Sequence, residues 1–171
     1  MGTGEVCARN SGYKFGKRIE LPYCPSRMQP LPQPYFAYGS NMDPLQMRDR
    51  CPGASILSAA TLAHHRWIIN TDGYATVIPA PGHTVYGVLW TLTATNLAVL
   101  DAYEGMHEDL YWRTEIEVVS LTDQQPLSAL IYFARSQQEG RPVPDYTEHI
   151  LRTARDFVFP ESYLRELAQF G

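Results

Sequence analysis

Two stretches of the 171-residue sequence carry residues that could perform chemistry together. The first is the segment 35–44, which reads YFAYGSNMDP. Its aromatic and small apolar residues predict a buried strand, and the G-S-N sequence at 39–41 then favours a tight turn. Asp43 suits the N-cap and Pro44 the first residue of a following helix. Such a segment would direct several backbone N–H groups at one point, which suits a carboxylate or a developing oxyanion.

The second stretch is the end of an expected helix over residues 94–103. Leu97 and Leu100 share one face of this helix with Glu104, by the three-and-four spacing. Gly105 is typical of the residue at which a helix stops. A carboxylate at Glu104 would therefore lie beside apolar side chains and at the negative end of the helix dipole. Both effects raise the pKa of a carboxyl group, so Glu104 is a candidate proton acceptor.

Each stretch also fits an ordinary structural role. A strand-to-helix turn that contains glycine is often only a connection, and a glutamate at a helix end often pairs with an arginine. Other catalytic patterns are missing from the sequence: the five histidines form no H-E-x-x-H pair, Ser40 is not in a G-x-S-x-G turn, and no Walker or Rossmann glycine pattern occurs. Three scattered cysteines fit neither a disulfide framework nor a zinc site. We therefore expect no metal and no cofactor.

The rest of the sequence predicts the elements that would hold these two stretches. Including the strand at the start of the first stretch, we expect six or seven strands, a hairpin turn at 71–73 and a corner made by Pro79, Pro81 and Gly82. The other strands are expected over 54–62, 65–70, 75–78, 84–92, 111–121 and 127–134, and the helices over 44–50, 94–103, 146–157 and 160–167. This pattern predicts an α+β fold, with a mixed, largely antiparallel sheet that closes toward a barrel and helices packed outside it.

Composition limits the domain organisation and the partners. A chain of this length with 44% hydrophobic residues can form one domain with a substantial core. A net charge of −4 gives no basic surface for nucleic acid and no polybasic membrane anchor, and no apolar run has the length of a membrane span. We expect a cytoplasmic protein with reduced cysteines. Residues 1–34 are rich in proline and aperiodic, which predicts an N-terminal arm ahead of a domain over 35–171.

Taken together, the two stretches resemble the signatures of the γ-glutamylcyclotransferase-like (AIG2-like) family. The sequence Y-F-A-Y-G-S-N-M resembles the signature strand and loop of the family. The sequence D-A-Y-E-G at 101–105 is similar to its D-x-x-E-G signature, in which the glutamate is the catalytic base. Tyr111 and Tyr146 fall where vertebrate members have tyrosines, the second of which contacts substrate. The resemblance covers about 35–167 and leaves the N-terminal arm outside.

The resemblance implies the γ-glutamylcyclotransferase-like fold and an enzyme that needs no cofactor. Its small-molecule γ-glutamyl substrate would cyclise by attack of the α-amino group on the γ-carbonyl, which releases 5-oxoproline and a free amino acid or amine. Glu104 would act as general base and then as general acid. The substrate-binding candidates are Tyr35, Phe36, Ala37, Tyr38, Gly39, Ser40, Asn41, Tyr111 and Tyr146, with the backbone of residues 38–41 as the anion site.

Two alternatives stay open at this point. One is a γ-glutamylamine cyclotransferase, or a biosynthetic enzyme that removes a γ-glutamyl group from a larger amine. The other is a non-catalytic anion-binding domain on the same fold, since a fold does not fix a function. An intact Glu104 argues against the second alternative, because a pure binding domain has no use for a desolvated carboxylate. The sequence leaves open which amine departs and whether the protein forms a homodimer.

Overall fold

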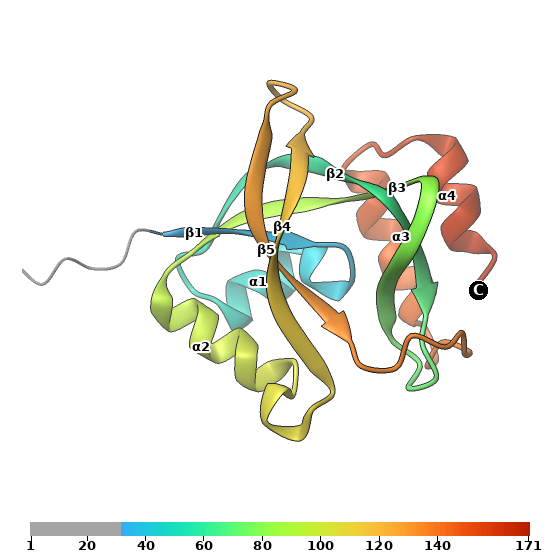
Figure 1. Ribbon diagram of the computed structural model, residues 1–171, viewed down its shortest axis with the longest axis horizontal. Coiled ribbons are helices and arrows are strands. Elements are labelled where there is room, and N and C mark those ends of the chain that lie inside the picture. The colour runs from blue at the N-terminus through green and yellow to red at the C-terminus, as the bar shows by residue number, and fades with distance from the viewer. Residues whose placement is uncertain (1–31) are drawn as a thin grey trace, which may run out of the picture.

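The computed structural model describes residues 32–171 (Figure 1). Within them, the strands are β1 Gln33–Ala37, β2 Ser55–Ile69, β3 Ala75–Leu92, β4 Tyr111–Ser120 and β5 Pro126–Ala134. The helices are α1 Pro44–Arg50, α2 Ala94–Tyr103, α3 Tyr146–Asp156 and α4 Glu161–Ala168, with the short 3-10 helices η1 Ser40–Met42 and η2 Met106–Glu108. The predicted N-terminal arm lies outside the described residues, apart from its last three residues, and β1 begins at Gln33.

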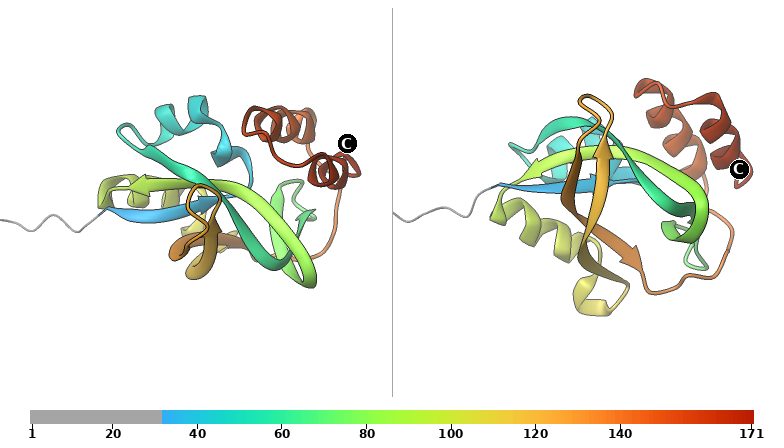
Figure 2. Two further views of the ribbon diagram at one scale, coloured as in Figure 1. Left: turned by 90° about the horizontal axis from the view of Figure 1, so that it is seen from above. Right: turned by 45° about the horizontal axis from the view of Figure 1, so that its top comes forward.

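The five strands close into a barrel in the order β1-β3-β2-β4-β5. Only the contact that closes the barrel, between β1 and β5, is parallel, with Tyr35 opposite Leu130. All other strand pairs are antiparallel. Helices α3 and α4 pack together beside the barrel, and α1 lies between them and α2, with Gln46 of α1 hydrogen-bonded to His149 of α3 (Figure 2). This arrangement confirms the predicted α+β fold with a mixed, largely antiparallel barrel.

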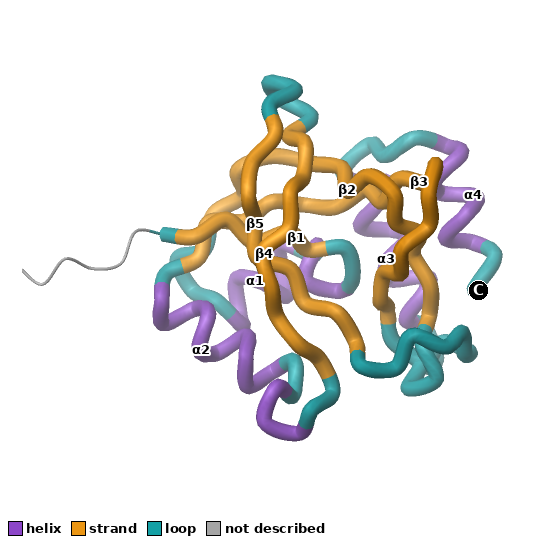
Figure 3. The backbone as a smooth tube through the Cα atoms, in the orientation of Figure 1, coloured by secondary structure: helices purple, strands orange, loops and turns teal. Residues whose placement is uncertain are grey.

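Two long strands replace four of the predicted ones, because β2 and β3 each run without a break (Figure 3). The predicted corner at Pro79–Gly82 does not separate two strands, because Pro79 lies inside β3, where it pairs with His65. The pairing passes from Ala63–Thr84 to His65–Pro79, so residues 80–83 of β3 form a bulge opposite one residue of β2. A bulge bends a strand without ending it, and proline is tolerated in a strand at or beside a bulge. The two strands therefore curl together over one end of the barrel (Figure 2). The hairpin turn predicted at 71–73 is confirmed: the Gly73 N–H donates to the Asn70 carbonyl at 3.0 Å.

Strand β1 is the part of the barrel that leads into the candidate site. Its last residues are almost inaccessible to solvent, with Phe36 at 0% and Ala37 at 1% exposure. Burial of both faces, with Tyr35, Phe36 and Ala37 all at most 3% exposed, explains why its sequence is a continuous apolar run instead of an alternating one. The strand lies so close to β3 that a Cβ atom at Gly87 would be 2.3 Å from the Ala37 carbonyl oxygen. The absence of a side chain at Gly87 thus allows β1 to approach β3 closely, and this approach sets the position of the turn that follows β1.

We predict that Gly87→Ala lowers the melting temperature by several degrees. The added Cβ would also lie 2.6 Å from the Phe36 ring, and the buried backbone of β1 has no room to retreat. Overpacking of this kind typically costs about 1–3 kcal/mol. The matched control is Gly171→Ala, since Gly171 has no strained positive φ and a Cβ added there would meet its nearest atom at an ordinary 3.6 Å. Thermal unfolding of both variants checks this, and equal melting temperatures would contradict it.

Candidate active site

Helix α2 ends at Glu104, which is its C-cap residue. At the start of the helix, Thr93 and Asn96 form a reciprocal capping box. At its end, the Glu104 N–H donates to the Leu100 carbonyl at 2.8 Å, and Gly105 follows in the left-handed conformation with φ 63. These local signals fix the helix end where the sequence predicts it. The carboxylate of Glu104 is thereby held at the wall of a pocket.

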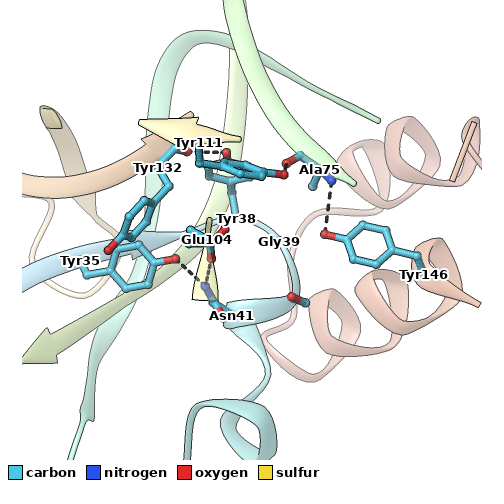
Figure 4. A pocket seen from close by; sticks show the side chains of 10 residues that line it. Tyr35, Tyr38, Gly39, Asn41, Ala75, Glu104, Tyr111, Tyr132 and Tyr146 are labelled. Atoms are coloured by element: carbon cyan, nitrogen blue, oxygen red, sulfur yellow. Dashed lines mark hydrogen bonds between the residues drawn. The ribbon is translucent and has the colours of Figure 1, made fainter. Parts of the chain in front are cut away.

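This inner pocket has a volume of about 40 Å³ and lies where β1 leads into η1 (Figure 4). Five tyrosines and one carboxylate give it a polar lining inside a mostly buried frame. Its lining residues are Tyr35, Tyr38, Gly39, Ser40, Asn41, Ala75, Glu104, Tyr111, Tyr132 and Tyr146. The only ionised side chain expected among them at neutral pH is Glu104, since tyrosine ordinarily titrates near pH 10.

The side-chain amide of Asn41 connects the two stretches that the sequence singles out. Its Nδ2 donates to Glu104 Oε1 at 2.7 Å and to the Tyr35 hydroxyl at 2.9 Å. Its Oδ1 accepts a hydrogen bond from the guanidinium of Arg50, at the end of α1. Because the cation can only donate, Arg50 fixes which side of the amide faces Glu104. Figure 4 shows Tyr35 and Glu104 on the same side of Asn41.

Burial raises the pKa of Glu104 above its ordinary value. The hydrogen bond from Asn41 and the positive charge of Arg50 both act in the opposite direction, because they favour the ionised form. The direction agrees with the expectation from the sequence, but its main cause is desolvation. The side chain can therefore ionise and still hold a transferred proton more firmly than a carboxylate in water.

Two tyrosines meet the backbone of Ala75, the first residue of β3. The hydroxyl oxygen of Tyr146 accepts a hydrogen bond from the Ala75 N–H at 3.3 Å. The Tyr111 hydroxyl donates to the Ala75 carbonyl at 3.0 Å. Burial raises the pKa of Tyr146 to about 12, so this hydroxyl keeps its proton at neutral pH. Its oxygen accepts from this backbone N–H group, which leaves the O–H hydrogen to donate into the pocket.

The chain is similar in sequence and in structure to known proteins over the segments that form this site. The AIG2-like family model matches residues 84–167, which include Glu104, Tyr111 and Tyr146. The gamma-glutamylcyclotransferases of Mus musculus and Homo sapiens are 29% and 27% identical to the chain over 143 residues, or 78% of this chain and 76% of each relative. The chain thus matches the AIG2-like family over 84–167 and is similar to gamma-glutamylcyclotransferases over most of its length. A solved gamma-glutamyl cyclotransferase has a TM-score of 0.74 and 26% identity, covering 81% of this chain and 88% of that chain. A yeast cyclotransferase specific to glutathione, at TM-score 0.55 and 12% identity, shares only the fold.

Most of the residues predicted to bind substrate lie together in the structure. Tyr35, the segment 38–41, Tyr111 and Tyr146 all line the inner pocket with Glu104. Phe36 and Ala37 do not line it, since both are buried within β1. They belong to the strand that positions the turn.

Gly39 lies in the turn with φ −117, a value that any residue adopts, so the turn does not need glycine for its φ. A side chain is unfavourable there for lack of space: a Cβ atom would be 3.1 Å from the Tyr146 hydroxyl and 3.4 Å from the Ala75 side chain. The first value is tighter than most contacts of real Cβ atoms. Glycine at this position thus preserves the opening between η1 and α3.

Sequence reasoning missed Arg50, Ala75 and Tyr132. Arg50 follows the signature loop by one short helix, and its position in the last turn of α1 was the one signal that could have drawn attention to it. Ala75 and Tyr132 lie in β3 and β5, and only the closed barrel brings these strands to the turn.

The described part of the chain contains neither of two further features, a cluster of metal ligands and a membrane-spanning helix. Residues 32–171 contain no group of three or more His, Cys, Asp or Glu side chains arranged to hold a metal ion. None of the helices described is long and apolar enough to cross a membrane. Cys51 is buried and has a free thiol.

We predict that Arg50→Gln raises the pKa of Glu104 further. Loss of the positive charge removes one of the two influences that favour the ionised carboxylate, and the neutral amide is a weaker partner for Asn41. Carboxyl ¹³C chemical shifts of Glu104, followed through a pH titration, measure this change. Arg48→Gln is the matched control, because Arg48 is in the same helix and exposed and pairs only with Asp49. A Glu104 titration unchanged in the Arg50 variant would contradict the proposed linkage.

Proposed function

We propose that this protein is a γ-glutamyl cyclotransferase that works without a metal or cofactor. The observation that carries the proposal is a desolvated carboxylate, Glu104, held by Asn41 at the wall of a small polar pocket. The similarity to gamma-glutamylcyclotransferases over most of the chain supports the same activity. The substrate is a small molecule that carries a γ-glutamyl group.

A γ-glutamyl compound contains its own nucleophile, which explains why the pocket needs no catalytic serine or cysteine. The α-amino nitrogen can reach the γ-carbonyl carbon by closing a five-membered ring. Holding the substrate in that folded conformation can contribute roughly 7–11 kcal/mol to lowering the barrier. A small pocket with rigid aromatic walls, such as Tyr35 and Tyr38, suits this task.

Glu104 carries the protons in this mechanism. Its ionised carboxylate takes one proton from the α-ammonium group, and the freed amine nitrogen attacks the γ-carbonyl carbon. The carbonyl π-electrons move to oxygen and form a tetrahedral oxyanion. When the oxyanion collapses, the bond from the γ-carbon to the leaving nitrogen breaks, and Glu104 gives its proton to that nitrogen. The carboxylate regenerated in this way takes the second proton from the ring nitrogen and releases it to the departing amine or to solvent. The products are 5-oxoproline and a free amine.

Tyr146 and the turn at 39–41 are suited to stabilise the oxyanion. The Tyr146 O–H is polarised because its oxygen accepts a hydrogen bond from the Ala75 N–H group. A preorganised donor at a developing oxyanion typically contributes a factor of roughly 10²–10³ to the rate. The N–H groups of Ser40 and Asn41, at the start of η1, are further candidate donors at the same wall, whereas the Met42 N–H is bonded to the Gly39 carbonyl at 2.9 Å.

The alternative functions would use the same pocket and differ in the products that they release. A γ-glutamylamine cyclotransferase or a biosynthetic deprotecting enzyme would release 5-oxoproline from a different amine. A non-catalytic anion-binding domain would release none. Measurement of 5-oxoproline with a panel of γ-glutamyl amino acids and γ-glutamylamines separates the three. The cytoplasmic location, a homodimer and an arm separate from the domain stay predictions from the sequence.

We predict that Glu104→Gln abolishes turnover without loss of stability. Glutamine can still accept the hydrogen bond from Asn41 but cannot take a proton, so 5-oxoproline release should fall by at least about 10²-fold. A raised pKa in the folded state means that the ionised carboxylate costs stability at neutral pH. The variant should therefore melt no lower than the wild type at pH 7 to 8. This advantage should shrink as the pH falls through the raised pKa and disappear below the ordinary value of 4.5.

Melting temperature and 5-oxoproline release, measured on the same preparations, check both parts. A folded Glu104→Gln protein with more than about a tenth of wild-type turnover would contradict the role of Glu104 as base. A large fall in melting temperature at pH 7 would indicate a structural carboxylate instead.

We predict that Tyr146→Phe lowers kcat by roughly 10–10³-fold, because it removes one oxyanion donor and leaves the ring in place. The fold should be retained, since the ring of Tyr146 still packs edge-on against Tyr74. Tyr163→Phe is the matched control: its hydroxyl bonds to the Tyr86 carbonyl at 3.3 Å, away from the pocket. Steady-state kinetics of both variants measure the effect, and equal kcat values would exclude Tyr146 as a donor.

A further inference from the structure

A second, larger pocket continues from the inner one. Its volume is about 480 Å³, compared with about 40 Å³ for the inner pocket. Ser40, Glu104, Tyr111 and Tyr146 line both pockets, so the two meet at the candidate general base. A volume of this size is within the range of sites for whole small-molecule ligands.

The chemistry of cyclisation determines what this outer pocket must hold. The leaving nitrogen is bonded to the γ-carbonyl carbon and receives its proton from Glu104. Whatever substituent that nitrogen carries must extend away from the inner pocket, on the side of Glu104. The outer pocket is the space that begins there, which makes it the site of the leaving amine.

The outer wall of this pocket is apolar and comes from separate segments of the chain. Tyr74 lies in the β2–β3 turn directly before β3, Tyr103 lies at the end of α2, and Leu110 lies just before β4. Their exposures of 46%, 58% and 45% place them among the few large hydrophobic side chains that face solvent. Val143 and Pro144 add apolar surface from the loop before α3. Exposed apolar side chains gathered around one concavity indicate a binding site.

Apart from Glu104, which is assigned to proton transfer, the charged groups of the outer pocket provide no strong anchor for a charged substituent on the leaving amine. Arg50 is already engaged, because its guanidinium donates to Ser40, Asn41 and Tyr103. Asp145 is exposed to solvent, where an ion pair contributes little.

His149 also lines the outer pocket and is expected to be neutral. Its Nδ1 accepts a hydrogen bond from Arg152 at 2.8 Å, and burial lowers its pKa. Contact with the apolar wall is therefore the main source of binding energy that the described lining offers.

We infer that the outer pocket selects γ-glutamyl compounds whose leaving amine carries a large apolar group, such as an aromatic or branched aliphatic side chain. This inference rests on the proposed cyclotransferase activity and specifies its substrate class. Each apolar group that the pocket covers favours the larger substrate, and even one methylene in a hydrophobic pocket discriminates by roughly 10–200-fold.

The test compares kcat/KM for 5-oxoproline release from matched γ-glutamyl dipeptides. The panel is γ-glutamylphenylalanine and γ-glutamylleucine as apolar members, γ-glutamylglycine as the member without a side chain, and γ-glutamylglutamate and γ-glutamyllysine as charged members of similar size. We expect kcat/KM for the apolar members to exceed that for all three others by at least about tenfold. A charged member equal to or better than the apolar ones, or no difference from γ-glutamylglycine, overturns the inference.

A pair of leucine variants links the preference to this wall. Leu110→Asp introduces a charge into the outer pocket and should bring the ratio of kcat/KM for γ-glutamylphenylalanine over γ-glutamylglycine close to one. Leu57→Asp is the control, because Leu57 is exposed to a similar extent, at 50%, and lines neither pocket. The control should keep the wild-type ratio. An unchanged ratio in the Leu110 variant also overturns the inference.

The same panel distinguishes failure of this inference from failure of the proposed function. Release of 5-oxoproline without an apolar preference overturns only the assignment of the outer pocket. No release from any member, by folded protein, overturns the cyclotransferase proposal and this inference with it.

Discussion

The arrangement of the site depends on one buried amide. Asn41 is 4% exposed, and its polar atoms bond to Glu104, Tyr35 and Arg50, which belong to α2, β1 and α1. A buried polar group without its partners is costly, so these elements cannot separate without a penalty. The same bonds limit how far burial raises the pKa of Glu104. The carboxylate is therefore basic enough to hold a proton and still able to ionise, which is what proton transfer in both directions requires.

The barrel brings the other half of the site to this amide. Strand β1 pairs with β3 and β5, and the glycine at position 87 lets β1 approach β3 closely. The curled β2–β3 hairpin carries Ala75 to the turn, where its N–H and carbonyl groups bond to Tyr146 and Tyr111. Helix α3 delivers Tyr146 from the other side (Figure 4). The pocket thus joins segments distant in sequence through backbone contacts.

The features that could be predicted from the sequence have local causes. The end of α2 follows from Gly105, and the hairpin at 71–73 from its turn residues. The raised pKa of Glu104 follows in direction from its apolar neighbours. Features that depend on packing could not be predicted. The bulge next to the His65–Pro79 pair keeps β3 continuous. Arg50 can orient the amide of Asn41 only because α1 lies beside that residue.

The most direct test of the central claim asks which atom attacks the γ-carbonyl. The protein should be incubated with a γ-glutamyl dipeptide that it turns over, in water enriched in ¹⁸O, and the products analysed by mass spectrometry. Intramolecular attack predicts 5-oxoproline in equal amount to the free amine, with no ¹⁸O incorporated during turnover. Free glutamate carrying ¹⁸O would show that water is the nucleophile and would contradict the mechanism built on Glu104 and the folded substrate.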